Sequence, residues 1–405
     1  MPDVKIIVGN GNLGRASQSL DGVAALIGSG AAIEGKFALG DILAFRSPAD
    51  AEAKGITASY DWANKVLLWH HIKDFYANAG EGAEFYVMPV ANTVLMADMA
   101  DKALLYAAKL LDTLKGRVRL LTISRTPVAG YTPVYAGQFD PDVWNAAAKA
   151  QELYANEFAK HRPIQIFIEG RDFQGDTATA KDLRSSITGL NANRVSIVIC
   201  QDYDVAALDA RFLKYAAVCS AMGRAAAVPV QRNIGRVKSG AIIFGKIAGL
   251  SSHSTLVDLP AADLNDLDAL GYIFLKNIDG KSSFFFNNNH CACPIADDYA
   301  YIHRGRPIDK ASRLVREVYI EELLDDIDVD AETGMIAPAV VKSYQRAAEK
   351  SIEINMNGEI SGVKVFVDPD QNVLSTDKIN TVMRIVPKGM ANAFEVLLSY
   401  ENPSA

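Results

Sequence analysis

The sequence has 405 residues, of which 49% are hydrophobic and 22% charged, and its formal net charge is −7. This length is sufficient for two or three domains, and the composition is that of a soluble globular protein rather than a disordered or membrane protein. The modest negative charge argues against a nucleic-acid-binding protein, because contacts with phosphates require a basic surface.

The sequence contains no apolar run of about 18 residues, so we expect no stable membrane insertion. Its first residues lack the basic and then apolar layout of a signal peptide. Four cysteines, at positions 200, 219, 291 and 293, are too few for a disulfide framework in a chain of this length. We therefore expect a protein that is made in the reducing cytoplasm and stays soluble there.

An apolar segment at residues 4–8 predicts a β-strand at the N-terminus, and a glycine-rich sequence follows it. Gly9, Gly11 and Gly14 have the spacing G-x-G-x-x-G, which after a strand is typical of a dinucleotide-binding turn. The next residues are polar and broken by glycine, with no clear second strand that ends in an acidic residue. We therefore favour a flexible hinge at these glycines, and an NAD(P)-dependent oxidoreductase is the alternative.

Helical and strand-like patterns alternate between residues 60 and 222. We expect helices at 60–79, 94–114, 140–160, 177–187 and 205–222, and strands at 84–88, 117–123, 164–168 and 194–200. Repeated βα units predict a parallel or mixed sheet with helices on its faces. The expected fold class is therefore α/β (α+β), with a mixed-sheet α/β body.

The second half of the chain combines turns, charged helices and terminal strands. Asp279 and Gly280 are the turn signal of a hairpin between 271–276 and 282–286. Beyond residue 297 the sequence becomes helical and highly charged. A further helix at about 338–354 is followed by three strand-like segments, 362–367, 381–386 and 394–400. We expect a C-terminal helix-and-strand domain and extended β-arms at both ends of the chain.

This organisation predicts four parts: an arm at 1–20, an α/β domain at 21–225, a core domain with charged helices at 226–360, and strands with an arm at 361–405. A strand at the edge of a sheet presents unpaired N–H and C=O groups, so terminal strands can pair with neighbouring copies of the chain. The residues predicted to link subunits in this way are Val4, Ile6, Val8, Phe394, Val396 and Leu398.

Candidate metal and catalytic sites are weak. His290, Cys291, Cys293 and His303 lie close in sequence, but the cysteines have one intervening residue and no matching second pair, so buried thiols are favoured over zinc. The acidic residues at 321–332 miss the calcium-loop spacing. No nucleophile elbow, Walker loop or H-E-x-x-H is present. We expect no catalytic, cofactor-binding or metal-binding residues.

Three cations, Lys342, Arg346 and Lys350, recur every four residues in the helix at 338–354. This spacing places them on one stripe of the helix surface. Such a row is commonly a solvated face. It can also form a screened, reversible electrostatic contact with another protein.

Several segments together resemble contractile tail sheath proteins, the family of phage tails, pyocin-like particles and related injection systems. The segments are DGVAALIG at 21–28, FYANAG at 75–80 before the strand at 85–87, DDYAYIHRGRPIDK at 297–310, and IVPKG at 385–389. No single motif is diagnostic, and the likeness lies in their order along nearly the whole chain.

The resemblance implies a structural subunit that polymerises around an inner tube by exchange of terminal β-strands and contracts to drive the tube through a target envelope. Its implied partners are itself, as a helical homo-oligomer of stacked rings, the inner tail tube protein, and baseplate and terminator proteins. The implied location is a virion tail or injection-particle sheath that is assembled in the bacterial cytoplasm. By the same resemblance, the helix with Lys342, Arg346 and Lys350 is the candidate tube contact.

Overall fold

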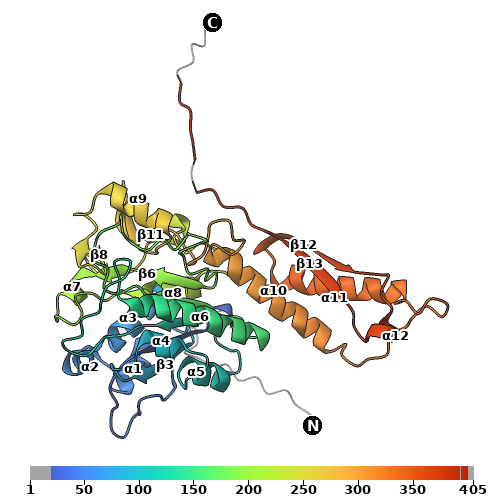
Figure 1. Ribbon diagram of the computed structural model, residues 1–405, viewed down its shortest axis with the longest axis horizontal. Helices are drawn as coiled ribbons and strands as arrows, with labels where there is room; N and C mark the ends of the chain where they lie inside the picture. Colours follow the sequence, from blue (N-terminus) through green and yellow to red (C-terminus); the bar gives the residue numbers. More distant parts are fainter. Residues whose placement is uncertain (1–19, 393, 400–405) are drawn as a thin grey trace, which may run out of the picture. The chain divides into compact units, whose positions relative to one another are not determined.

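The computed structural model describes residues 20–392 and 394–399. The chain divides into two compact units, which we call unit 1 (Met1–Arg313) and unit 2 (Leu314–Ala405). The boundary lies within helix α10 (Ile302–Ile320), coloured orange in Figure 1. The division into four parts that we expect from the sequence stays a prediction.

Unit 1 is built on a six-stranded mixed sheet with the order β2-β3-β1-β4-β5-β6. All neighbouring pairs are parallel except β2 and β3, which are antiparallel. The strands are β1 (Ala24–Ser29), β2 (Leu43–Phe45), β3 (Phe85–Val90), β4 (Leu120–Ile123), β5 (Gln165–Glu169) and β6 (Val195–Val198). The expected mixed-sheet α/β body is confirmed.

Two helical layers cover this sheet (Figure 1). In one layer α3 packs on α8, and in the other α4 packs on α6. The chain moves in one direction across the sheet from β1 to β3 and in the opposite direction from β3 through β4 to β5. Right-handed crossovers therefore place the two layers on opposite faces. The helices of this part are α1 (Pro48–Ala53), α2 (Ala58–Asn64), α3 (Leu68–Ala79), α4 (Met96–Ala100), α5 (Ala107–Leu114), α6 (Pro141–Ala159), α7 (Tyr203–Ala206) and α8 (Val218–Ala227).

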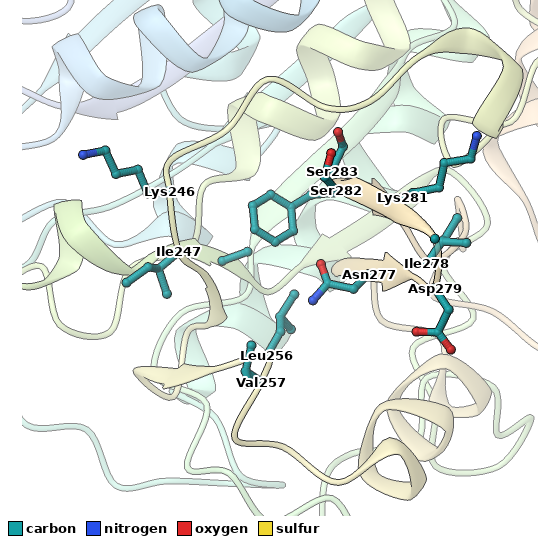
Figure 2. A pocket seen from close by; sticks show the side chains of 13 residues that line it. Lys246, Ile247, Leu256, Val257, Asn277, Ile278, Asp279, Lys281, Ser282 and Ser283 are labelled. Carbon is teal, nitrogen blue, oxygen red and sulfur yellow. The ribbon is translucent and has the colours of Figure 1, made fainter.

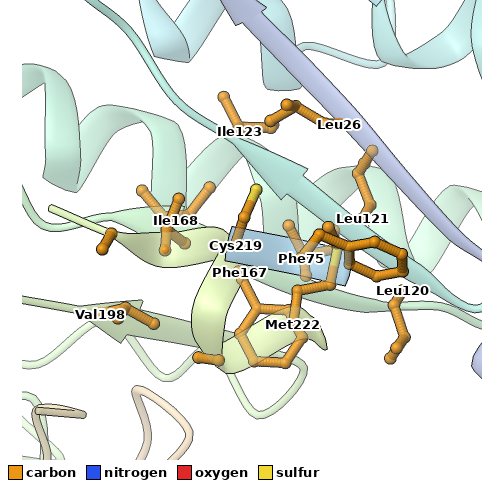
Figure 3. Close-up of a cluster of buried hydrophobic side chains, with 14 of the residues drawn as sticks. Leu26, Phe75, Leu120, Leu121, Ile123, Phe167, Ile168, Val198, Cys219 and Met222 are labelled. Carbon is orange, nitrogen blue, oxygen red and sulfur yellow. The ribbon is translucent and has the colours of Figure 1, made fainter. Parts of the chain in front are cut away.

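The core between the sheet and the α3–α8 layer is apolar and closely packed. Figure 3 shows Phe75 of α3 and Met222 of α8 against Leu120 and Phe167 of the sheet, and all four side chains are fully buried. Thr122 of β4 donates a hydrogen bond to the Met222 sulfur at 2.9 Å, so this buried hydroxyl has a partner. Burial of this kind is the main stabilising contribution to an α/β body.

The rest of unit 1 contains smaller elements. A three-stranded antiparallel sheet joins β7 (Cys200–Asp202), β8 (Ala248–Leu250) and β9 (Ser254–Thr255), and helix α9 (Ala261–Leu270) follows. The hairpin of β10 (Leu275–Ile278) and β11 (Lys281–Phe286) turns at Asp279 and Gly280, as predicted. Gly280 has φ +77°, a conformation that glycine adopts without strain.

Unit 2 is the expected C-terminal helix-and-strand domain. It contains α11 (Pro338–Asn355), β12 (Ile360–Val367), the short α12 (Val373–Thr376) and β13 (Thr381–Pro387). Strands β12 and β13 form a two-stranded antiparallel sheet, and α11 packs on β12. The helix expected at 338–354 and the strands expected at 362–367 and 381–386 are confirmed.

Two expected helices are interrupted. The helix expected at 60–79 is divided into α2 and α3, because Lys65 adopts a left-handed conformation with φ +54°. The Asp61 carboxylate then accepts the amides of Trp69 and His70 at 3.0 Å each and caps the start of α3. The helix expected at 94–114 is divided into α4 and α5 by a turn, in which Asp101 accepts the Ala103 amide at 2.8 Å.

The expectations for 177–187 and for most of 205–222 were wrong. In the first segment Asp176, Asp182 and Ser185 accept nearby backbone amides, and such local bonds compete with helix formation. In the second, the amides of residues 216 and 217 bond to Glu169 and to the Cys200 carbonyl, which are distant in sequence. Only α7 and α8 at its two ends are helical.

Strand β1 was not expected, although it lies in the middle of the large sheet. Its sequence, AALIGS, is buried at every position, so it shows no polar alternation. Gly28 packs closely there, because a Cβ atom at this residue would lie 3.1 Å from the Ser124 hydroxyl oxygen, which is tighter than most Cβ contacts. A glycine within this stretch is therefore compatible with a buried strand.

Candidate assembly surfaces

The β12–β13 hairpin has an inner face that packs on unit 2 and an outer face that is exposed. On the inner face Val365 and Val367 of β12 are buried, whereas Met383 and Ile385 of β13 are only half-buried. Tyr344 and Val341 of α11 belong to the same apolar cluster as Val367. The helix therefore covers β12 more completely than β13.

The outer face exposes three apolar side chains around two cations. Phe366 and Val382 face each other across the hairpin and are 55% and 51% exposed, and Val386 is 57% exposed. Lys364 and Arg384 are also Cα partners and are both exposed. Like charges placed directly opposite each other destabilise a strand pair.

The two outer edges of this hairpin differ. Within the described chain neither β12 nor β13 pairs with a third strand. On β12, however, the Val365 amide donates to a carboxylate oxygen of Glu349 at 2.9 Å. This amide therefore points away from β13 and is already bonded. The two ends of β13 also have side-chain contacts, because Tyr319 bonds to the Thr381 side chain and Ser361 donates to the Pro387 carbonyl at 3.0 Å. Between these ends, residues 382–386 have no side-chain hydrogen bond to another described residue.

The predicted linking residues fall into two groups. Val4, Ile6 and Val8, like the hinge glycines Gly9, Gly11 and Gly14, lie outside the described residues. Residues 394–399 are described, and in the single chain they form no helix or strand. The side chains of Phe394, Val396 and Leu398 are 87%, 72% and 88% exposed. Subunit linking by either group stays a prediction.

The predicted tube-contact residues do share one stripe of α11. Lys342, Arg346 and Lys350 are exposed, and the structure gives them no ion pair with another described residue. The opposite side of the helix is buried. The stripe is therefore a free cationic surface in this subunit, and its contact with a tube stays a prediction.

The acidic segment after α10 is a solvated loop. Asp330 accepts hydrogen bonds from the hydroxyl and amide of Thr333 and from the Glu332 amide, and these bonds lower the pKa of its carboxyl group. The other carboxylates of this segment are exposed. In the part of the chain that the structure describes, no three His, Cys, Asp or Glu side chains are placed to hold a metal ion.

Histidines and cysteines near residue 290 have separate partners. His290 contacts Asp268 through Nε2 at 3.0 Å, and His303 contacts Asn289 through Nδ1 at 2.9 Å. Burial raises the pKa of the Cys291 thiol to about 11 and also raises the pKa of Cys293. These cysteines are therefore neutral, buried thiols in this fold.

The carboxyl edge of the large sheet is the usual ligand position in α/β enzymes. Here it is filled by buried side chains that bond to each other and to the backbone. The Thr126 amide donates to Ser29 at 3.0 Å, the Arg125 amide donates to Glu169 at 2.7 Å, and Arg171 donates to the Arg125 carbonyl at 2.9 Å. These groups hold the strand ends together.

Glu169 illustrates this structural role. Its second carboxylate oxygen accepts the Ala216 amide at 2.9 Å, so one side chain connects the ends of β4 and β5 to the segment before α8. Burial raises the pKa of this carboxyl group to about 7. The side chain is 1% exposed, which leaves no access for a substrate.

A hollow of about 440 Å³ lies elsewhere, beside the β10–β11 hairpin. Leu256 and Phe284 contribute apolar surface to it. Figure 2 shows Lys246 and Lys281 extending away from its centre. Polar residues also line it, among them Asn277, Asp279 and Ser282, but its lining contains no histidine or cysteine.

Comparison with solved structures identifies the fold as that of contractile sheath subunits. The structure is similar to a chain of the anti-feeding prophage baseplate (TM-score 0.61, 13% identity, 99% of both chains covered). It is also similar to the anti-feeding prophage helical sheath in the contracted state (TM-score 0.61, 14% identity, 99% of both chains). A third match is the contracted sheath complex of the extracellular contractile injection system PVC (TM-score 0.58, 11% identity, 100% of this chain and 98% of that chain).

The chain belongs to the DUF2586 family. The N-terminal domain of this family matches residues 1–290, and its C-terminal domain matches residues 298–405. A sequence search of curated proteins finds no match. Among the helices that the structure describes, none combines the length and apolar character needed to cross a membrane.

Proposed function

We propose that this protein is the sheath subunit of a contractile injection particle, of phage-tail or bacterial type. The observation that carries the proposal is the two-stranded sheet of unit 2, whose strands have no third partner within the described residues. An isolated two-stranded sheet is marginally stable, and its edges can accept strands from other chains. The likeness of the whole chain to sheath subunits supports the same function.

In the proposed assembly, the terminal segments of each copy add strands to the β12–β13 hairpins of neighbouring copies. Main-chain hydrogen bonds hold such strands whatever the orientation of the attached body, so the subunits can rotate while they remain linked. Contraction of the linked lattice would drive an inner tube. The exposed stripe of Lys342, Arg346 and Lys350 is the proposed tube contact, and baseplate and terminator proteins are the proposed partners at the two ends.

Electron microscopy of the purified full-length chain tests this function. We expect rings or tubes of constant diameter. Deletion of residues 389–405 should abolish them and leave the melting temperature of the subunit unchanged, because residues 394–398 are exposed and make no strand in the single chain. A chain that stays monomeric at all concentrations, and whose melting temperature rises with NAD(P), would instead support the dehydrogenase alternative.

A further inference from the structure

The outer face of the β12–β13 hairpin lacks a negative charge. Lys364 and Arg384 are direct cross-strand partners, and neither forms an ion pair with any residue in 20–392 or 394–399. A carboxylate on an adjacent strand would convert this repulsion into attraction.

Apolar side chains close to Arg384 are also exposed to solvent. Val382 and Val386, two residues before and after it, point to the same outer face and are about half exposed. On the inner face Met383 and Ile385 are only half-buried, because α11 packs on β12. A strand that complements β13 therefore needs an acidic residue and an apolar residue on one face and apolar residues on the other.

The C-terminal segment has this pattern. Phe394, Val396 and Leu398 alternate with Glu395 and Leu397. In the single chain all five side chains are exposed, and the segment forms no helix or strand. In a strand, the first three residues share one face and the other two share the opposite face.

We propose that residues 394–398 of a second copy add to the open edge of β13, with Glu395 beside Arg384; this inference rests on the sheath assembly proposed above. In this register Phe394, Val396 and Leu398 cover the inner face next to Met383 and Ile385. Leu397 then lies beside Val382 if the new pair is antiparallel, or beside Val386 if it is parallel, because both valines are two residues from Arg384. Either direction covers an exposed valine.

Two observations favour this pairing over the other arrangements. On β12 the Glu349 carboxylate already accepts the outward amide of Val365 at 2.9 Å, so a strand added there must displace it. The other candidate strand, at residues 4–8, carries Lys5 as its only charged residue. Next to Lys364 and Arg384 it would add a third positive charge, whereas Glu395 neutralises one.

A charge swap in the full-length protein tests the pairing. Arg384→Glu and Glu395→Arg should each raise the critical concentration for polymer formation, measured by sedimentation, about five- to thirty-fold, since each replaces an attraction by a repulsion. The double variant should return to near the wild-type value. Lys378→Glu is the matched control, because Lys378 is exposed in the same unit but precedes β13, and it should assemble normally.

The melting temperature of the unassembled subunit separates this effect from misfolding. Arg384→Glu places opposite charges across the hairpin, so the subunit should be as stable as the wild type or more stable while it assembles less well. If the wild type polymerises and either single variant polymerises equally well, or if the double variant is not restored, the Glu395–Arg384 pairing is overturned. If the wild type itself forms no polymer, the proposed function fails instead.

Discussion

The buried ion pair of Arg194 and Asp309 provides a strong test of how α10 is held on unit 1. Arg194 Nε lies 3.1 Å from Asp309 Oδ2, and the side chains are 3% and 5% exposed. The guanidinium also lies 4.3 Å from the centre of the Tyr299 ring. Replacing Asp309 with alanine leaves a buried positive charge without its partner. We expect a loss of about 3–5 kcal/mol in the free energy of unfolding.

Tryptophan fluorescence in a urea titration measures this loss selectively, because the three tryptophans of the chain, Trp62, Trp69 and Trp144, all belong to unit 1. The matched control is Glu152→Ala. Glu152 pairs with Lys102 at 3.3 Å, but both side chains are almost half exposed, so its loss should cost at most about 1 kcal/mol. Equal effects of the two substitutions, with unchanged dependence on urea, would refute the reasoning.

Two further predictions concern charge. Burial raises the pKa of Glu169 from 4.5 to about 7. Between these pH values the native state keeps a proton that the unfolded state loses. The free energy of unfolding should therefore fall by about 1.4 kcal/mol for each unit of increase in pH. Glu169→Gln should remove this part of the slope in urea titrations from pH 4.5 to 7; an identical slope would contradict the assignment. Replacing Lys342, Arg346 and Lys350 with glutamine should change the free energy of unfolding by less than about 0.5 kcal/mol. It should also weaken salt-dependent cosedimentation with the tube protein. Unaltered cosedimentation would show that this stripe is not the tube contact.

The elements that were predicted correctly from the sequence are those with local signals. Asp140 and Pro141 mark the start of α6, and in the structure the Asp140 carboxylate accepts the Asp142 amide at 2.9 Å. The Asp-Gly turn of the β10–β11 hairpin and the Pro338 start of α11 are of the same kind. In each case the residues that determine the structure are within a few positions of each other.

The elements that were missed depend on distant partners. Strand β1 is buried at every position. Its sequence therefore has no alternation of polar and apolar residues that would indicate a strand. The segment before α8 is not helical because Ala216 and Ala217 bond to groups at 169 and 200. At the candidate surface, the two strands could be predicted from the sequence. That Lys364 lies directly opposite Arg384 could not, because it depends on the register of β12 and β13.

Polar groups are bonded within the subunit at the carboxyl edge of the body sheet, whereas the charged groups of the exposed hairpin lack partners of opposite charge. At the carboxyl edge of the body sheet, Glu169 and Arg171 are buried and bonded within the subunit, so the place where an α/β enzyme would bind its ligand has become part of the scaffold. In the hairpin, two cations oppose each other, the edge of β13 is open at residues 382–386, and apolar side chains on the outer face are half exposed. Groups that are unsatisfied within one copy can be satisfied by another, which is why we place the function of this chain in unit 2 and in assembly.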